Sequence, residues 1–474
     1  MEFILRGYHV DDPTWFYLSF LLIIAVYFKF NRFWSLRNVD LGLLLLISPG
    51  VLFVTRQPGT GYVWLFVATA ALLIRVLSDS LFTRRPRLEQ NMNVHGLTFL
   101  LAATFAFLMT KVMTEPPPQA TVDSVRHASK LLAREDTTHA AVPATPPAEA
   151  SPGSSLIVAP VVGISKVVTA QETRRATPSL ETSLDAETAT LLDLPGLNDP
   201  DLVAARTLAI LAHLAVVLGL IVAGRRLFND APGGVAMATL YLLLPCTAVD
   251  VGKVIHVLPA ALIVWALVAY RRPLVSGALM GLACSTLFFP IFLLPLWGAF
   301  YGRRGAFRFG LSVAATTLII VGSLALTSAD WQSFLGQTFG GYTEWAQLQF
   351  RSAVGSAGFW NEGLAEYRLP VLVTFGVLLV VLTIWPLQRN LGHLMSQSAA
   401  IVLGTQFWYP QQGGVYVLWY LPLLLLVVFR PMLSQQLAPE IKPLAWLWRR
   451  QSLDVTAKGP QLVASTGGSM LRFR

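Results

Sequence analysis

The sequence predicts an all-α protein that crosses a membrane many times. Hydrophobic residues make up 54% of its 474 residues and charged residues only 13%, against about 45–50% and about 25% in soluble domains. The mean hydropathy is +0.58, and the apolar residues form separate runs of the length that spans a bilayer as a helix, about 20 residues. These features exclude an ordinary soluble enzyme, a disordered protein and a partner of nucleic acid, in spite of the net charge of +9.

Eleven of these apolar runs are predicted to span the membrane as single helices. They lie near 14–30, 39–55, 62–79, 95–112, 204–224, 232–250, 254–270, 306–326, 369–386, 391–409 and 414–429. A longer apolar stretch, 274–301, is interrupted by Pro290 and Pro295. Proline disrupts helical hydrogen bonding, so this stretch is not predicted to be a single uninterrupted helix.

The basic residues predict the orientation. They gather in alternate loops, and cytoplasmic loops are the ones enriched in Lys and Arg. This places the N-terminus outside and the C-terminus inside an inner (plasma) membrane. It also requires 274–301 to cross as two short half-helices that meet near Phe288–Pro290, because a single helix would put Arg303, Arg304 and Arg308 on the wrong side. We therefore expect about 13 transmembrane segments.

Four regions are predicted along the chain. Residues 1–114 form an N-terminal four-helix membrane region, and residues 201–432 form the main transmembrane domain, followed by a cytoplasmic tail, 433–474. Residues 115–200 hold 11 of the 29 prolines, and acidic residues outnumber basic ones there. A stretch of this composition buries too little apolar surface to offset its ordering entropy. It is predicted to be a disordered, Pro/Ala/Thr-rich acidic linker outside the cell.

A polar cluster follows the sixth predicted span. Asp250, Lys253 and His256 lie within seven residues at the outer membrane surface. Polar groups close to membrane depth are costly and therefore mark candidate functional sites. Asp250 can act as a base and Lys253 as a phosphate ligand. The alternative is a paired polar turn at the water interface, since residues three apart on a helix are neighbours.

Two further outer groups combine aromatic and polar residues. The loop 327–368 contains Trp345, Trp360, Glu362 and Arg368, and the last hairpin contains Trp408 and Tyr409. Aromatic faces suit sugar rings, carboxylates accept hydroxyl protons, and arginine binds phosphate through two donors. The alternative is the ordinary aromatic belt of a membrane protein.

No motif for a soluble cofactor or metal is present. The chain lacks the glycine-rich nucleotide loops and the His and Cys spacings of metal sites, and its seven histidines are scattered. Cys246 and Cys284 lie inside apolar runs, which predicts no disulfide framework. We expect neither a metal nor a cofactor.

Residues 200–432 resemble the C-terminal part of GT-C-type membrane glycosyltransferases, particularly those that use polyprenol-phosphate-mannose. The resemblance rests on three stretches: an Arg-headed span, a basic Gly-Arg-Arg loop and a second span ending in proline (204–245), paired short helices followed by a basic loop (276–308), and the closing hairpin (404–431). It implies transfer of a sugar, with mannose as a candidate, from a lipid-linked donor to an extracytoplasmic glycan or protein acceptor.

The resemblance also implies site residues and shows one departure. Members place a catalytic acid in the first large outer loop, where Asp201 precedes Arg206, and often carry a lysine three residues before the proline of the paired helices, where this chain has Leu287. Asp201 or Asp250 is then the expected base, and Arg206, Lys253 or Arg368 is expected near the phosphate. Because of this departure at Leu287, an inactive scaffold of the same fold is the alternative function. A lipid or polymer transporter is a second alternative, but few charges lie within the spans.

Overall fold

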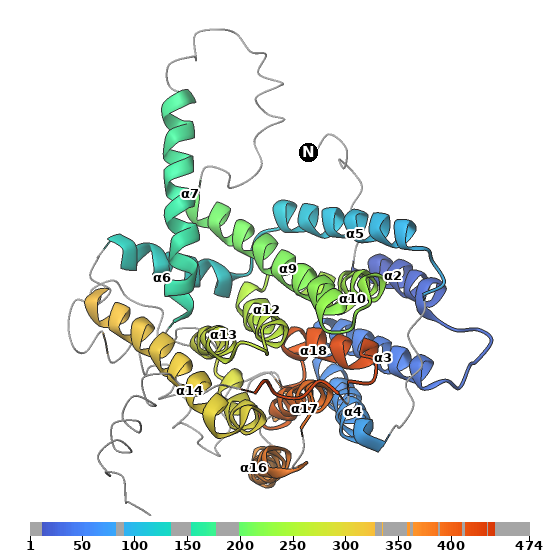
Figure 1. Cartoon of the computed structure of the whole chain (residues 1–474). Coiled ribbons are helices and arrows are strands. Elements are labelled where there is room, and N and C mark those ends of the chain that lie inside the picture. Colours follow the sequence, from blue (N-terminus) through green and yellow to red (C-terminus); the bar gives the residue numbers. More distant parts are fainter. Residues whose placement is uncertain are drawn as a thin grey trace, which may run out of the picture. The chain divides into compact units, whose positions relative to one another are not determined.

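The computed structural model describes residues 12–81, 90–133, 153–176, 199–327, 334, 358–360, 364–386, 389–409, 413–433 and 435–440. These residues are almost entirely helical (Figure 1). Met1–Ala438 form one compact unit. The structure confirms an all-α polytopic membrane protein.

Five helical stretches in the described part of the chain are long and apolar enough to cross a membrane. They are Leu36–Arg56, Pro58–Leu77, Val94–Thr114, Pro200–Arg226 and Phe289–Leu326. The remaining apolar helices are shorter, at 10–17 residues. Within the described residues, the predicted span 232–250 is divided just before Pro245 into two helices, Ala231–Leu243 and Pro245–Val249.

The N-terminal region consists of α2 (Asp12–Tyr27), α3 (Leu36–Arg56), α4 (Pro58–Leu77), η1 (Ser78–Leu81) and α5 (Val94–Thr114). Local sequence sets its boundaries. The Ser35 and Asn93 side chains accept hydrogen bonds from the backbone amides of Asn38 and Gly96 and so cap α3 and α5. Pro58 begins α4, a position where proline loses no helical hydrogen bond. These helices match the four predicted spans.

Two helices occupy part of the predicted linker: α6 (Gln119–Ala133) and α7 (Ser154–Ala176). For these two stretches the prediction of disorder is wrong. The reason is local pattern, because Val122, Val125, Ala128 and Leu131 recur every three residues on α6 and are buried there. An overall acidic, proline-rich composition conceals a single apolar face of this kind. Residues 134–152 and 177–198 lie outside the described part of the chain.

The main transmembrane region follows the order predicted for residues 204–429. It contains α9 (Pro200–Arg226), α10 (Ala231–Leu243), α11 (Pro245–Val249), α12 (Val254–Val268), α13 (Pro273–Thr286), η2 (Phe289–Leu293), α14 (Leu294–Thr327), η3 (Ala365–Tyr367), α16 (Arg368–Ile384), α17 (Leu391–Trp408) and α18 (Val417–Phe429).

The predicted pair of half-helices is confirmed. α13 ends at Thr286, η2 turns the chain, and α14 begins at Leu294. Gly302 then interrupts α14 with φ +64°, a conformation that costs little only for glycine. The stretch between Leu294 and Gly302 is therefore a separate short helix, and the basic residues 303–308 begin the next span.

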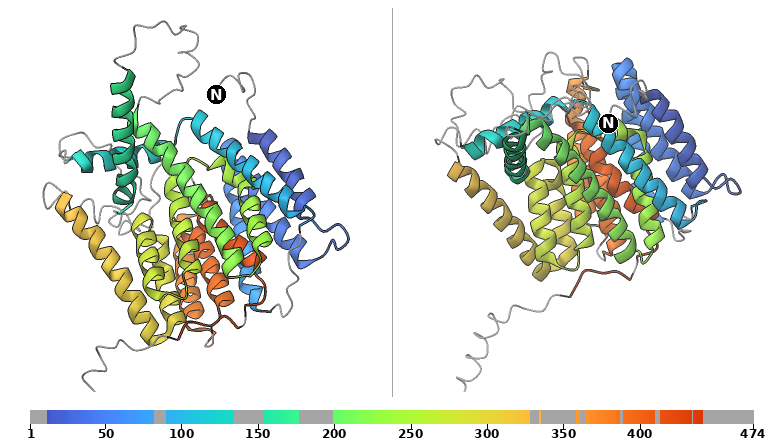
Figure 2. Two further views of the ribbon diagram at one scale, coloured as in Figure 1. Left: turned by 45° about the horizontal axis from the view of Figure 1, so that its top comes forward. Right: turned by 90° about the horizontal axis from the view of Figure 1, so that it is seen from above.

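The N-terminal helices pack directly on the main region. α4 lies against α17, and α5 lies beside α9 and α10 (Figures 1 and 2). Gly414, with φ +90°, lets the hairpin before α18 approach α4, since a Cβ there would lie 3.3 Å from Leu65 Cβ. The two predicted membrane regions thus share one hydrophobic core.

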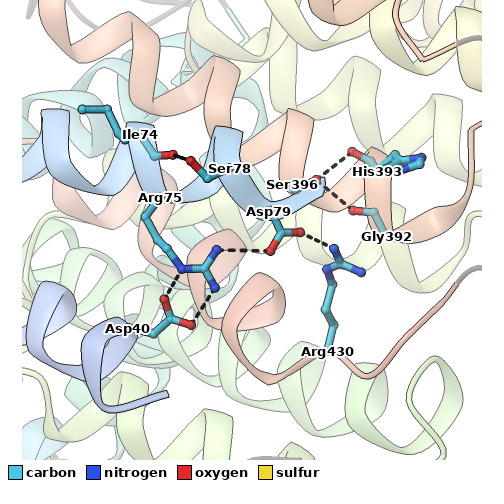
Figure 3. A network of polar contacts seen from close by, with 9 residues as sticks. All are labelled: Asp40, Ile74, Arg75, Ser78, Asp79, Gly392, His393, Ser396 and Arg430. Carbon is cyan, nitrogen blue, oxygen red and sulfur yellow. Dashed lines mark hydrogen bonds and ion pairs between the residues drawn. The ribbon is translucent and has the colours of Figure 1, made fainter. Parts of the chain in front are cut away.

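A buried ionic network joins the N-terminal helices to the end of α18 (Figure 3). Arg75 of α4 binds the Asp40 carboxylate with Nε and with Nη2, the latter at 2.8 Å, and binds Asp79 through Nη1 at 3.3 Å. Asp79 also pairs with Arg430, which directly follows α18. This network lies at the end of the bundle opposite to Asp250 and is termed the ionic clasp. It consists of Asp40, Arg75, Asp79 and Arg430.

Candidate functional site

The turn between α11 and α12 carries a compact charged pair. Asp250 caps the C-terminus of α11, and its Oδ1 lies 2.8 Å from Lys253 Nζ. The Asp250 side chain is 7% exposed and that of Lys253 is 37% exposed. The predicted pairing is therefore present.

Two buried contacts hold this turn in place. His213 Nε2 of α9 lies 2.9 Å from the Val251 carbonyl oxygen, and His213 Nδ1 lies 2.9 Å from the Tyr241 hydroxyl. Because a carbonyl only accepts, Nε2 must carry the ring proton, and Nδ1 then accepts from Tyr241. From the other side, the Thr121 hydroxyl of α6 donates to the Gly252 carbonyl at 3.1 Å. Both α6 and α9 thus fix the backbone on which Asp250 and Lys253 stand.

An aromatic cluster begins directly beside this turn. His256 Nδ1 accepts a hydrogen bond of 2.9 Å from the indole Nε1–H of Trp419. Trp419 stacks on Tyr416 with ring centroids 4.4 Å apart and on Phe289 at 4.8 Å. Phe288, at the tip of the half-helices, stacks on Tyr409 at 4.9 Å. The half-helices, α12 and the last hairpin therefore meet at one place.

Trp408 and Trp360 extend this cluster toward α16 and α4. Trp408 contacts Phe288 and Phe375 of α16. Trp360 donates from Nε1 to the Phe407 carbonyl at 2.8 Å and is almost fully buried. Both predicted tryptophans are therefore anchored in the protein interior and are not exposed members of an aromatic belt.

The N-terminal region contributes residues that sequence analysis did not single out. Phe66 of α4 lies 4.1 Å from Phe359 between ring centroids and also contacts Phe407. Tyr62, one turn earlier on α4, is buried and lies within electrostatic range of Lys253. No local pattern distinguishes either residue from an ordinary apolar helix position, since their partners are hundreds of residues away.

Asp201 and Arg206 lie in a different part of the structure. The Asp199 side chain accepts from the Asp201 amide at 2.9 Å and caps α9, and acidic residues in a first turn suit the helix dipole. Helix-start chemistry therefore accounts for both acids, although Asp201 Oδ1 is buried without a hydrogen-bond partner among the described residues. Arg206 is buried on α9.

The geometry of α9 separates Asp201 from Asp250. His213 contacts the residue next to Asp250, and twelve residues of α-helix rise about 18 Å from His213 back to Asp201. Arg206 stands about 10 Å above the same level. The two predicted bases are thus alternatives for two different sites and cannot act on one substrate bond together.

Three predicted site residues remain: Arg368, Glu362 and Trp345. Arg368 begins α16 and is buried, and its Nε has no hydrogen-bond partner among the described residues. Glu362 and Trp345 lie outside the described residues. Within the part of the chain that is described, no group of three or more His, Cys, Asp or Glu side chains is arranged to hold a metal ion.

This arrangement defines a polytopic helical membrane protein with a charged pair and an aromatic cluster at one end of its bundle. Residues 189–410, a little under half of the chain, match the sequence model of glycosyltransferase family 87. The match supports a membrane glycosyltransferase and hence a transferase activity. It covers α9 to α17, including the Asp250–Lys253 turn and the half-helices. No curated protein and no solved structure matches the chain.

Proposed function

We propose that this protein transfers a sugar, with mannose as a candidate, from a polyprenyl-phosphate donor to an extracytoplasmic glycan or protein acceptor. The observation that carries the proposal is the Asp250–Lys253 pair, which lies beside the aromatic cluster within the segment that matches the glycosyltransferase family. We further propose that this end of the bundle faces outward across an inner membrane. The basic residues that gather at the opposite end, such as Arg271 and Arg430, support that orientation.

The chemistry assigns complementary roles to the pair. The Asp250 carboxylate takes the proton of the acceptor hydroxyl as the acceptor oxygen bonds to the sugar C1. The bond between C1 and the phosphate oxygen breaks at the same time, and polyprenyl phosphate leaves with the electron pair. Lys253 stabilises the charge of this leaving phosphate. Because Lys253 binds one oxygen of Asp250, the carboxylate is held oriented with the other oxygen toward the acceptor.

The aromatic cluster supports a role in binding the sugar or the lipid. Ring faces such as that of Tyr409 offer apolar contact to sugar C–H groups and to isoprenyl chains. Trp408, Trp360 and Arg368 are proposed to line the binding region at the neighbouring helices. Glu362 and Trp345 remain proposed members of the same region, and Asp201 with Arg206 remains the alternative catalytic pair.

The test is transfer by purified protein with a synthetic polyprenyl-phosphate sugar. Asp250→Asn is expected to abolish transfer and to leave folding intact, because it removes charge and basicity at nearly constant volume. Asp230→Asn is the matched control: Asp230 caps α10, its side chain accepts from the Gly233 amide at 2.9 Å, and asparagine caps equally well. It is expected to retain activity.

Two results would contradict the assignment. If Asp250→Asn is active and Asp201→Asn is inactive, the base lies at the start of α9 and the Asp250–Lys253 pair is structural. If the wild-type protein neither transfers sugar from nor binds any polyprenyl phosphate, the enzyme proposal fails. An inactive scaffold would then be favoured by Leu287, a fully buried core residue at the tip of the half-helices.

A further inference from the structure

Helix α7 carries apolar residues on both of its sides. One side packs on the protein and includes Val158 and Val162, which are buried. The other side is exposed, and there Ile164 and Val167 are 65% and 66% exposed. Residues three or four positions apart lie on one face of a helix, so these two and the exposed Pro160 form one row. This row is termed the apolar stripe.

Helix α6 shows what a helix facing water looks like in the same protein. Its Val125 and Ala128 are buried, whereas Asp123, Arg126 and Lys130 are exposed. One apolar and one polar face are typical of a helix at an aqueous surface, whereas a helix that is apolar all round is covered on all sides. The apolar stripe of α7 therefore requires a cover other than water.

Contacts on the packed side place α7 at the end of the bundle that holds the Asp250 turn. α7 packs along α6, and the Thr121 hydroxyl of α6 binds the Gly252 carbonyl in that turn. The Ser165 hydroxyl of α7 donates to the Pro200 carbonyl at 3.2 Å, where α9 begins. The packed side is thus fixed at the level at which α9 starts, and the apolar stripe faces away from it.

Helix α7 runs across the spanning helices. Figure 1 looks nearly along α12, α13 and α17 but shows α7 lengthwise, and the right view of Figure 2 shows the reverse. α7 begins between α13 and α14, because a Cβ at Gly153 would lie 2.5 Å from Ser285 Cβ and 3.0 Å from Ile320 Cγ2. From there it projects past the start of α9 (Figure 1). This direction is that of a membrane surface.

The length of α7 agrees with this direction. Its apolar part, Ser154–Val167, belongs to the helices of 10–17 residues. Even 17 residues rise only about 26 Å, less than the hydrocarbon core of about 30 Å. Apolar helices of such length are buried core helices or re-entrant or interfacial segments. The exposure of Ile164 excludes a buried core helix, and the direction of α7 favours an interfacial one.

The apolar stripe is also close to a surface that lipid covers. α14 belongs to a candidate span, and its Ile319 is 68% exposed. On another face of α14, Ile320 and Leu324 form a hydrophobic cluster with Leu131 of α6 and Leu156 of α7. The pair of helices α6 and α7 is therefore attached to a lipid-facing helix, and lipid is the cover nearest to hand.

We propose that α7 is an interfacial helix whose apolar stripe inserts into the lipid leaflet at the Asp250 end of the bundle. The apolar face of such a helix lies about 5–10 Å deep, at the boundary of headgroups and acyl chains. Lys166 is the one charged residue in 154–167 and stands between Ile164 and Val167. A lysine at this depth buries its stem in lipid and extends its ammonium to the headgroup phosphates. The proposal is independent of sugar transfer.

The first test uses the wild-type, full-length protein. It is reconstituted in phosphatidylcholine–phosphatidylglycerol vesicles that contain a phospholipid with a diazirine near the headgroup end of its acyl chain. After illumination, mass spectrometry should locate adducts on Ile164 or Val167, and on Ile319 of α14 as the lipid-facing control. Val162, on the packed side of α7, and Asp123 of α6 should carry none. Adducts on Ile319 without any on the apolar stripe would overturn the proposal.

The second test distinguishes lipid from protein as the cover. Nitroxide labels are attached to Ile164→Cys, Val167→Cys and the control Arg126→Cys, and the signal from Cys246 and Cys284 of the wild-type protein is subtracted. Oxygen dissolves in lipid, so it should relax the two α7 labels more than a water-soluble nickel chelate does, with the opposite order at Arg126→Cys.

Two outcomes of this second test would contradict the proposal. If the nickel chelate has the greater effect at Ile164→Cys, the apolar stripe lies in water. If both reagents have little effect on the α7 labels and their spectra are strongly immobilised, a protein covers the apolar stripe, either a second copy of this chain or another partner. Should a cysteine variant fail to fold, photolabelling of the wild-type protein decides the question.

Discussion

Replacing Arg430 by leucine tests whether the ionic clasp holds the N-terminal helices onto the main region. Arg430 pairs with Asp79, whose side chain is 1% exposed, and Arg430 itself is 8% exposed. Asp79 also binds Arg75, which binds Asp40. The clasp therefore contains two acidic and two basic side chains, and Arg430→Leu leaves two buried carboxylates with one guanidinium.

The expected cost follows from burial. Removing one partner of a buried ion pair costs about 3–5 kcal/mol, because the remaining charge is uncompensated. Asp79 keeps its contact with Arg75 at 3.3 Å, so a cost at the lower end, about 3 kcal/mol, is expected. The double variant Asp79→Leu/Arg430→Leu leaves the balanced Asp40–Arg75 pair. Replacement of a complete buried pair by apolar residues is often neutral, so the double variant should be more stable than Arg430→Leu alone.

The assay is reversible unfolding of the purified protein in mixed micelles titrated with a denaturing detergent. Wild type, the two single variants and the double variant form a thermodynamic cycle whose coupling energy isolates the pair. Glu115→Leu provides the control, because Glu115 forms a more exposed pair with Lys111 at 3.7 Å. That change should cost at most about 1 kcal/mol.

Two outcomes would refute this reasoning. If Arg430→Leu costs no more than Glu115→Leu, the clasp contributes no more than a surface ion pair. If the double variant loses more unfolding free energy than the sum of the losses in the two single variants, the two side chains do not stabilise each other as the structure indicates.

Three other predictions concern packing and topology. Gly392→Ala should destabilise by about 1–3 kcal/mol because its Cβ would collide with Arg430, whereas Gly376→Ala, which meets nothing within 4 Å, should not; detergent unfolding measures both. Val125→Ser should cost about 1.5–3 kcal/mol by exposing the buried face of α6, while Asp123→Ser on its exposed face should be neutral. Cysteines introduced at Ala144 and Ser465 test the orientation with an impermeant reagent in intact cells: labelling of Ala144 alone is expected, and labelling of Ser465 alone would reverse every proposed outer site.

The helices could be predicted from the sequence because their signals are local. Apolar runs of bilayer length gave the helical elements, and the alternation of basic loops required a break in 274–301 that the structure has between Thr286 and Leu294. The same approach failed for α6 and α7. There a composition averaged over 86 residues outweighed an apolar face that only four residues of α6 carry.

The candidate site was predicted only in part. Asp250 and Lys253 are three residues apart, so their pairing could be expected from helical spacing. The association of His256 with Trp419 could not be expected, because the two are 163 positions apart and nothing in either segment specifies the other. The same holds for His213, which appeared as a scattered histidine without a ligand and proves to hold the backbone of the Asp250 turn.

The sequence by itself determined that this is a helical membrane protein, where most of its helices begin and end, and which short segments carry charge. Hydropathy, proline and capping residues act over a few residues and can be evaluated in one dimension. Only the tertiary structure decided which of the predicted polar segments meet. It brings Asp250 and His256 to the tip of the half-helices and the last hairpin, and leaves Asp201 about 18 Å away along α9. Distances between segments depend on how helices pack, and packing is a sum of many weak contacts that no single segment contains.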